Sequence, residues 1–281
     1  MSTIKAVGGS LAAIILGVAA QILAVLCGEL LVSAGVSGVA GNIVSGILYP
    51  VLTLVFFFVL ARILKIRLSD VGITGFKLKL RWIVAAVLLP IAVTGVYLLL
   101  PGAFASSGMD SVTAFSRLSA GVFFSGIGAG FAEEMIFRGF VMRLLKKRWN
   151  TKLAVILPSV LFGLVHIIGM EFSFVSCLLV IAAGTAVGIM FSLISLEGEN
   201  IWNDGFVHCI WNIVIIGGTI CISHSADPDS LWTYVLDTDS FVMTGGEFGI
   251  ESSVIAVAGY IIVTLAAFLF LRRKKTDPEV K

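Results

Sequence analysis

The sequence predicts an all-α protein, a polytopic membrane bundle of about eight transmembrane helices. Hydrophobic residues make up 58% of its 281 residues and charged residues only 13%, whereas about 25% of the residues in a typical soluble domain are charged. Apolar windows of about 20 residues, long enough to cross the hydrocarbon core of a bilayer, recur along the chain. We therefore expect a single integral membrane domain over residues 1–281, surrounded by the lipid bilayer.

The apolar windows place the spans in order along the chain. They cover residues 11–34, 42–64, 82–101, 118–142, 153–170, 173–196, 201–222 and 252–271. The connection over residues 65–80 is too polar to span, and we expect it at the membrane interface with Leu68, Val71 and Phe76 dipping into lipid. The long loop at 223–250 has room for a small structure of its own, which the sequence does not identify.

Basic residues are concentrated in three of the segments outside the spans. Residues 62–81, residues 143–152 and the tail that begins at Arg272 are rich in Lys and Arg, whereas the 223–250 loop contains neither. The 102–117 loop holds one Asp and one Arg. Because cytoplasmic loops carry an excess of Lys and Arg, this pattern favours eight spans with both termini in the cytoplasm.

Three ionisable residues lie inside the predicted span 118–142, within GAGFAEEMIFRGF: Glu133, Glu134 and Arg138. Each such group at a bilayer centre costs about 2.5–3.5 kcal/mol, so a cluster of them indicates a functional site. Arg138 follows Glu134 by four residues, so the two share a helix face and can pair. Glu133 lies about 100° further round the helix and is free to face the bundle interior.

Later spans contain two more polar pairs at helical spacing. His166 follows Phe162 by four residues, and Asn212 follows His208 by four. A single buried His or Asn, or a Glu–Arg pair, is often no more than an interhelical hydrogen-bonding group. The presence of all of these groups in apolar spans of one chain favours a functional site.

Three sequence boxes resemble those of the CPBP (Abi) family of intramembrane proteases, which includes the CaaX prenyl endopeptidases and bacteriocin-processing proteins. EEMIFRGF resembles the family's EExxxR box, FGLVH its FxxxH box and HCIWN its HxxxN box, in the family's order. The matching core covers about residues 80–222, so the first two spans and the last span are accessory.

The resemblance implies a role for each matching residue. Glu133 and His166 would activate a water molecule, and His208 and Asn212 would polarise the scissile carbonyl. Glu134, Arg138 and Phe162 would support them. In the mechanism that we favour, Glu133 acts as general base and then as acid, because burial brings the pKa of a carboxyl group nearer the range that proton transfer needs.

The sequence leaves several alternatives open. In a zinc-dependent version of the same protease, Glu133, His166 and His208 would bind the metal and leave one position open. A proton-coupled transporter or a non-catalytic immunity factor would also place ionisable residues in spans. For a protease of this kind, the expected partner is a membrane-associated peptide or protein. Nucleic acid is not expected, because the chain has no basic stretch with interleaved aromatic residues. The size of the chain and its lack of a targeting segment favour a bacterial plasma membrane.

Overall fold

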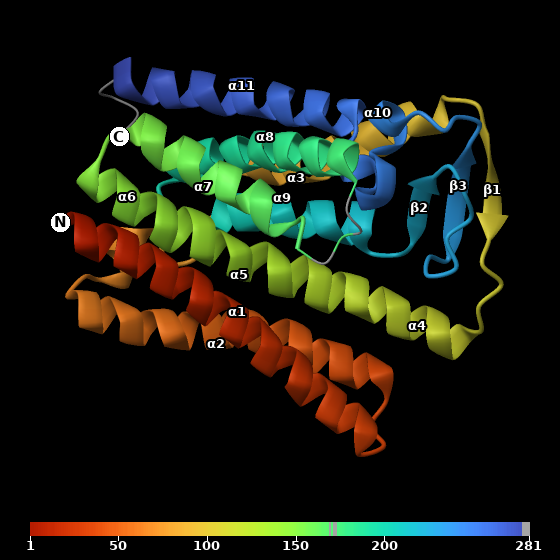
Figure 1. Cartoon of the computed structure of the whole chain (residues 1–281), viewed down its shortest axis with the longest axis horizontal. Coiled ribbons are helices and arrows are strands. Elements are labelled where there is room, and N and C mark those ends of the chain that lie inside the picture. The colour runs from red at the N-terminus through yellow and green to blue at the C-terminus, as the bar shows by residue number, and fades with distance from the viewer. Residues whose placement is uncertain (169, 171–172, 277–281) are drawn as a thin grey trace.

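The computed structural model describes residues 1–168, 170 and 173–276, and the structural statements below concern those residues. They form a bundle of long helices with roughly parallel axes, in which the N-terminus and the end of α11 near Thr276 lie at the same end (Figure 1). The prediction of a helical, polytopic membrane bundle is confirmed.

Helices α1 (Thr3–Ser33), α2 (Gly38–Leu64) and α3 (Leu80–Leu98) form the first part of the bundle. One continuous helix, Ser111–Arg148, follows. The second half contains α7 (Thr151–Val165), α8 (Phe174–Gly198), α9 (Trp202–Trp211), the short α10 (Phe241–Thr244) and α11 (Val254–Thr276).

The continuous helix changes its winding along its length. Its α-helical parts are α4 (Ser111–Ser119), α5 (Gly130–Glu134) and α6 (Met142–Arg148). Two π-helical stretches, Ala120–Ala129 and Met135–Val141, separate them. A π-helix bonds residue i to i+5, so its turns are wider, and such turns occur frequently at functional sites.

Within the described residues, six helices are long and apolar enough to cross a membrane. They are Thr3–Ser33, Gly38–Leu64, Leu80–Leu98, Ser111–Arg148, Phe174–Gly198 and Val254–Lys274. The other two predicted spans are shorter helices, so a count of eight is not confirmed. In the predicted span 153–170 the helix ends at Val165 after 15 residues, and Gly169 lies outside the described residues. In the predicted span 201–222 helical structure ends at Ile216, before a strand begins at Ile220.

A small sheet forms from two loops and from the end of the predicted span 201–222, where a strand replaces the expected helix. Strand β3 (Trp232–Leu236) lies between β1 (Gly102–Ser106), which is antiparallel to it, and β2 (Ile220–Ser223), which is parallel to it. The sheet joins the loop after α3 to the loop after α9. It lies at the end of the bundle opposite the two termini (Figure 1).

Ion pairs join the basic segments to one another at the end that holds the termini. Lys79 Nζ lies 2.6 Å from Oε1 of the buried Glu197, and Lys274 Nζ donates to the carbonyl oxygen of the same residue at 3.5 Å. Lys147 pairs with Asp70 at 3.5 Å. The three Lys/Arg-rich segments therefore gather at one end of the bundle.

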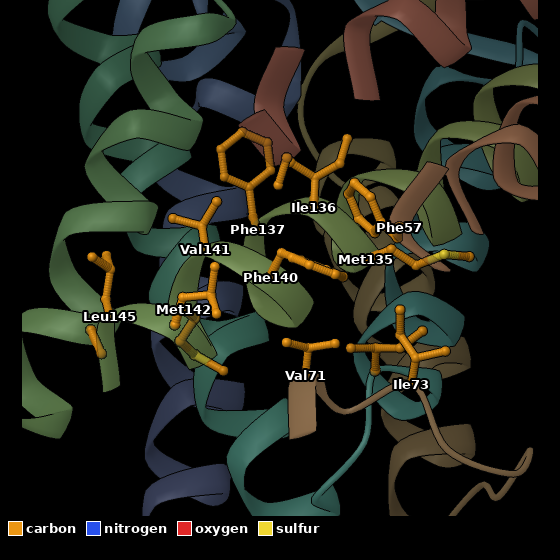
Figure 2. Packing of buried hydrophobic residues seen from close by; sticks show 14 of the residues in the cluster. Phe57, Val71, Ile73, Met135, Ile136, Phe137, Phe140, Val141, Met142 and Leu145 are labelled. Atoms are coloured by element: carbon orange, nitrogen blue, oxygen red, sulfur yellow. The ribbon is translucent and has the colours of Figure 1, made fainter. Parts of the chain in front are cut away.

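The main hydrophobic core surrounds the helix that continues from the two glutamates. Figure 2 shows residues between Met135 and Leu145 packed against neighbouring segments, and the rings of Phe57 and Phe140 lie 4.3 Å apart. Val71 belongs to this core and is fully buried, so the expectation that it faces lipid is wrong. The connection over residues 65–80 folds back onto the bundle at its 3₁₀ turn, Leu68–Val71. The turn ends at Gly72, whose φ of 75° is favourable for glycine.

Helices α5 and α9 approach closely enough that their backbones nearly touch. A Cβ atom added to Gly130 would lie 2.8 Å from the Cα atom of Cys209, which is too short for any real contact. Glycine at this position therefore sets the separation of the two helices that carry Glu133 and His208.

Candidate active site

The three boxes meet at one cavity inside the bundle. Glu133 comes from α5, His166 follows the last residue of α7, and His208 and Asn212 come from α9 and the turn after it. All four line the cavity, and so does Phe162. The cavity measures about 190 Å³, several times the roughly 30 Å³ that a water molecule occupies in the liquid. It has room for a water molecule beside a reacting group.

Glu134 and Arg138 form a buried ion pair behind the cavity, as their spacing predicted. Arg138 Nη1 donates to Glu134 Oε1 at 2.9 Å, and neither side chain is exposed to solvent. The guanidinium group lies over the rings of Phe162 and Phe191, 4.5 and 5.1 Å from their centroids. These cation–π contacts add to the stabilisation of the buried charge.

Glu134 also binds His208, a contact that the sequence did not predict. Its Oε1 lies 2.9 Å from Nδ1 of His208, so that nitrogen donates to the carboxylate. The imidazole ring stacks on Phe191 with centroids 4.8 Å apart and planes 21° from parallel. The remaining ring nitrogen, Nε2, lies 4.0 Å from Oε2 of Glu133.

Glu133 faces the cavity, as its angular offset from Glu134 predicted. It lies in α5, a five-residue α-helical stretch between the two π-helical stretches. Its side chain is 21% exposed, while that of Glu134 is fully buried. The adjacent glutamates therefore have separate environments: Glu133 borders the cavity and Glu134 lies within the packed protein.

His166 is held by the turn of α7 that precedes it. Its Nδ1 donates to the carbonyl oxygen of Phe162 at 2.6 Å, and its ring packs on the Phe162 ring with centroids 4.5 Å apart. The predicted packing of these two side chains on one helix face is confirmed. With Nδ1 as the donor, Nε2 of the neutral ring carries the lone pair.

Asn212 is held by the first π-helical stretch. Its Nδ2 donates to the carbonyl oxygen of Ser125 at 2.8 Å, which leaves a second N–H on the same nitrogen. Asn212 itself begins a π-helical turn, Asn212–Ile216. Wide helical turns on both sides of this contact bring together residues that are 87 positions apart in the chain.

Asp204, which the sequence analysis passed over, is fully buried near Glu134. Among the described residues, neither of its carboxylate oxygens has a hydrogen-bond donor, and the same is true of Glu134 Oε2. Asp204 interacts electrostatically with both Glu134 and Arg138. The sequence did contain a signal for Asp204: it is an ionisable residue inside an apolar segment, four residues before His208. An ionisable residue in a span indicates a functional site, as it did for Glu133.

Glu251 is a second residue that the sequence did not single out. It belongs to a 3₁₀ turn, Ile250–Ser252, just before α11, and its side chain lines the cavity together with Glu133. It carries no motif and lies at the border of an apolar window, so spacing gave no reason to choose it.

The zinc alternative needs Glu133, His166 and His208 to converge on one point. In the part of the chain that the structure describes, no three His, Cys, Asp or Glu side chains are grouped so that they would hold a metal ion. In each histidine Nδ1 is bound, to Phe162 or to Glu134, so Nε2 is the nitrogen that could reach a metal, and the two Nε2 atoms and Glu133 are not grouped in this way. The donor atoms in this arrangement therefore do not fit a three-ligand zinc site.

Comparison with known families agrees with the three boxes. Residues 115–214 match the family model described as type II CAAX prenyl endopeptidase Rce1-like. The resemblance to the CPBP family is confirmed. The matched segment contains Glu133, His166, His208 and Asn212 and ends before Glu251. No curated protein and no solved structure matches the chain significantly. The match supports an endopeptidase, and the apolar helices support an integral membrane protein.

Proposed function

We propose that this protein is an intramembrane endopeptidase that hydrolyses a peptide bond with a water molecule activated by Glu133 and His166. The observation that carries this proposal is that four residues from three separate boxes line one cavity within the bundle. The family match over residues 115–214 supports the same reaction class.

Activation of water requires acceptors for its protons. The carboxylate of Glu133 and the lone pair on Nε2 of His166 are two such acceptors at the wall of the cavity. A water molecule between them donates one hydrogen bond to each, and Glu133 removes a proton as the oxygen attacks the carbonyl carbon. The C–O bond then forms, and the carbonyl oxygen becomes an oxyanion.

Asn212 and His208 stabilise the oxyanion by donating hydrogen bonds to it. The second N–H of Asn212 is available because the first is bound to Ser125. In His208, Nδ1 already donates to Glu134, so Nε2 donates only when the ring carries both protons. Glu134 lies beside Nδ1 of this ring and Glu133 beside Nε2, so Nε2 is the ring nitrogen that borders the cavity.

Glu133→Gln tests the proposal in purified protein in detergent. The probes are internally quenched peptides of randomised apolar sequence and a farnesylated peptide that ends in a CaaX sequence, the substrate class in the family's description. We expect cleavage by the wild type and a loss of at least about 100-fold in the variant, the size of a general-base contribution. Glu29→Gln, a change to a glutamate of α1 outside the cavity, serves as the matched control.

Three results would count against the proposal. The wild type would cut neither probe, Glu133→Gln would cut at the wild-type rate, or both glutamine variants would lose activity equally. Because detergent-solubilised protein has no ion gradient, cleavage under these conditions also separates a protease from a proton-coupled transporter.

A further inference from the structure

Glu251 is held in place by contacts from two helices and from its own turn. The Tyr260 hydroxyl of α11 donates to the carbonyl oxygen of Glu251 at 3.0 Å. Trp211 of α9, next to Asn212 in the chain, hydrogen-bonds to the Glu251 carboxyl group. The Ser252 hydroxyl donates to the carbonyl oxygen of Gly245 at 2.6 Å and closes the turn. These contacts fix a carboxyl group at the wall of the cavity that Glu133 lines.

The surroundings of Glu251 favour its neutral form. Burial, followed by the charge of Glu133, raises the pKa of Glu251 to about 8, although the hydrogen bond with Trp211 opposes the shift. Glu251 lies just before the last membrane span, Val254–Lys274. The Glu251 carboxyl group therefore holds a proton at neutral pH.

The proposed hydrolysis needs a proton donor as well as a base. When the tetrahedral intermediate collapses, the C–N bond breaks, and the amine nitrogen must gain a proton because an amide anion is a very poor leaving group. Enzymes that use two carboxyl groups assign base and acid to groups whose environments differ. Glu133 beside an imidazole and Glu251 among apolar groups form such a pair.

We propose that Glu251 is a second catalytic residue, which protonates the leaving amine while Glu133 serves as the base. This assignment rests on the proposed endopeptidase function. Water gives one proton to Glu133 and its oxygen to the carbonyl carbon. The C–N bond breaks, Glu251 gives its proton to the nitrogen, and the oxyanion returns as the new carboxyl group. The proton held by Glu133 then passes to Glu251 through water, which restores both groups.

A leaving-group comparison tests this role with two substrates. One is the quenched peptide that the wild type cleaves fastest, in which the leaving group is an amine. The other joins the same acyl segment to a phenol as an aryl ester, whose phenolate leaves without gaining a proton. We expect Glu251→Gln to cut the peptide at least about 100-fold more slowly and the aryl ester at the wild-type rate. Glu133→Gln should lose both activities, because both substrates need activated water.

The outcomes separate the two proposals. Glu251→Gln that cleaves the peptide at the wild-type rate, or that loses both substrates equally, would overturn the acid role while leaving the protease assignment intact. A wild type that cleaves neither substrate, or a fully active Glu133→Gln, would instead refute the proposed function. If Glu251→Gln does not fold, Glu251→Asp withdraws the acid by one methylene, and the same selective loss of peptide cleavage is expected.

Discussion

Glu134 holds His208 through a hydrogen bond of 2.9 Å between Oε1 and Nδ1, across 74 residues of sequence. The same oxygen accepts from Arg138, so one carboxylate oxygen joins the first box to the third. The second glutamate of the EE doublet therefore orients the histidine that faces the cavity and neutralises a buried arginine. Such outer contacts fix the ring orientation and decide which nitrogen carries the proton.

Glu134→Gln should destabilise the protein far more than Glu133→Gln does. The amide leaves the fully buried Arg138 without its counter-charge, and removing one partner of a buried pair costs about 3–5 kcal/mol. Thermal unfolding of the two variants in the same detergent measures the difference. Equal midpoints for the two variants would show that Glu134 has no such structural role.

Gly130→Ala should reduce both stability and cleavage. The added Cβ would lie 2.8 Å from the Cα and backbone N atoms of Cys209 and force α5 away from α9, and overpacking of this kind costs about 1–3 kcal/mol. The shift also separates Glu133 from His208, and a misplacement of about 1 Å can cost roughly 100-fold in rate. The matched control is Gly95→Ala in α3, where a Cβ meets nothing within 4 Å. Wild-type activity in Gly130→Ala would show that this separation is not critical.

Removal of metal should leave cleavage unchanged. The described donor atoms do not converge on a zinc position, and the proposed reaction uses only protons and hydrogen bonds. Protein purified with a strong chelator should keep its activity, and elemental analysis should find well under one zinc per chain. Stoichiometric zinc, with activity lost on stripping and regained on adding it back, would establish the metal-dependent mechanism instead.

Cysteine labelling should place both termini in the cytoplasm. The Lys/Arg-rich segments gather at the end of the bundle that holds the termini, and the positive-inside rule assigns that end to the cytoplasm. A cysteine at the exposed Ser225, between β2 and β3, should react with an impermeant thiol reagent on intact cells. One at Thr276 should react only after lysis. The parent protein measures the background from Cys221, which lies in β2. The reverse order of labelling would invert the orientation.

Local contacts of the site could be predicted from the sequence because a regular helix fixes them. The Glu134–Arg138 pair and the packing of Phe162 on His166 both follow from four-residue spacing. The helical class and most span positions followed from hydrophobicity. The three boxes identified Glu133, His166, His208 and Asn212 as cavity residues, whereas Glu251 carries no motif.

Contacts between distant helices could not be predicted in this way. The Glu134–His208 and Asn212–Ser125 hydrogen bonds depend on how each helix is rotated and shifted against its neighbour, which hydrophobic periodicity leaves undetermined. The π-helical stretches add to the difficulty because they change the angle per residue. The sheet was missed because its strands have only four or five residues, and because β1 pairs with β3 across more than a hundred positions. Val71 was placed in lipid because its apolar character does not distinguish lipid from a protein core.

The separate environments of Glu133 and Glu134 imply different fates for altered chains in a cell. We expect a chain that has lost Glu133 to fold and accumulate, because it keeps the buried pair of Glu134 and Arg138. We expect a chain that has lost Glu134 to be scarce, since a destabilisation of about 1–2 kcal/mol already changes abundance several-fold. Substitutions at two neighbouring positions should therefore differ in outcome, one leaving an abundant inactive protein and the other leaving little protein at all.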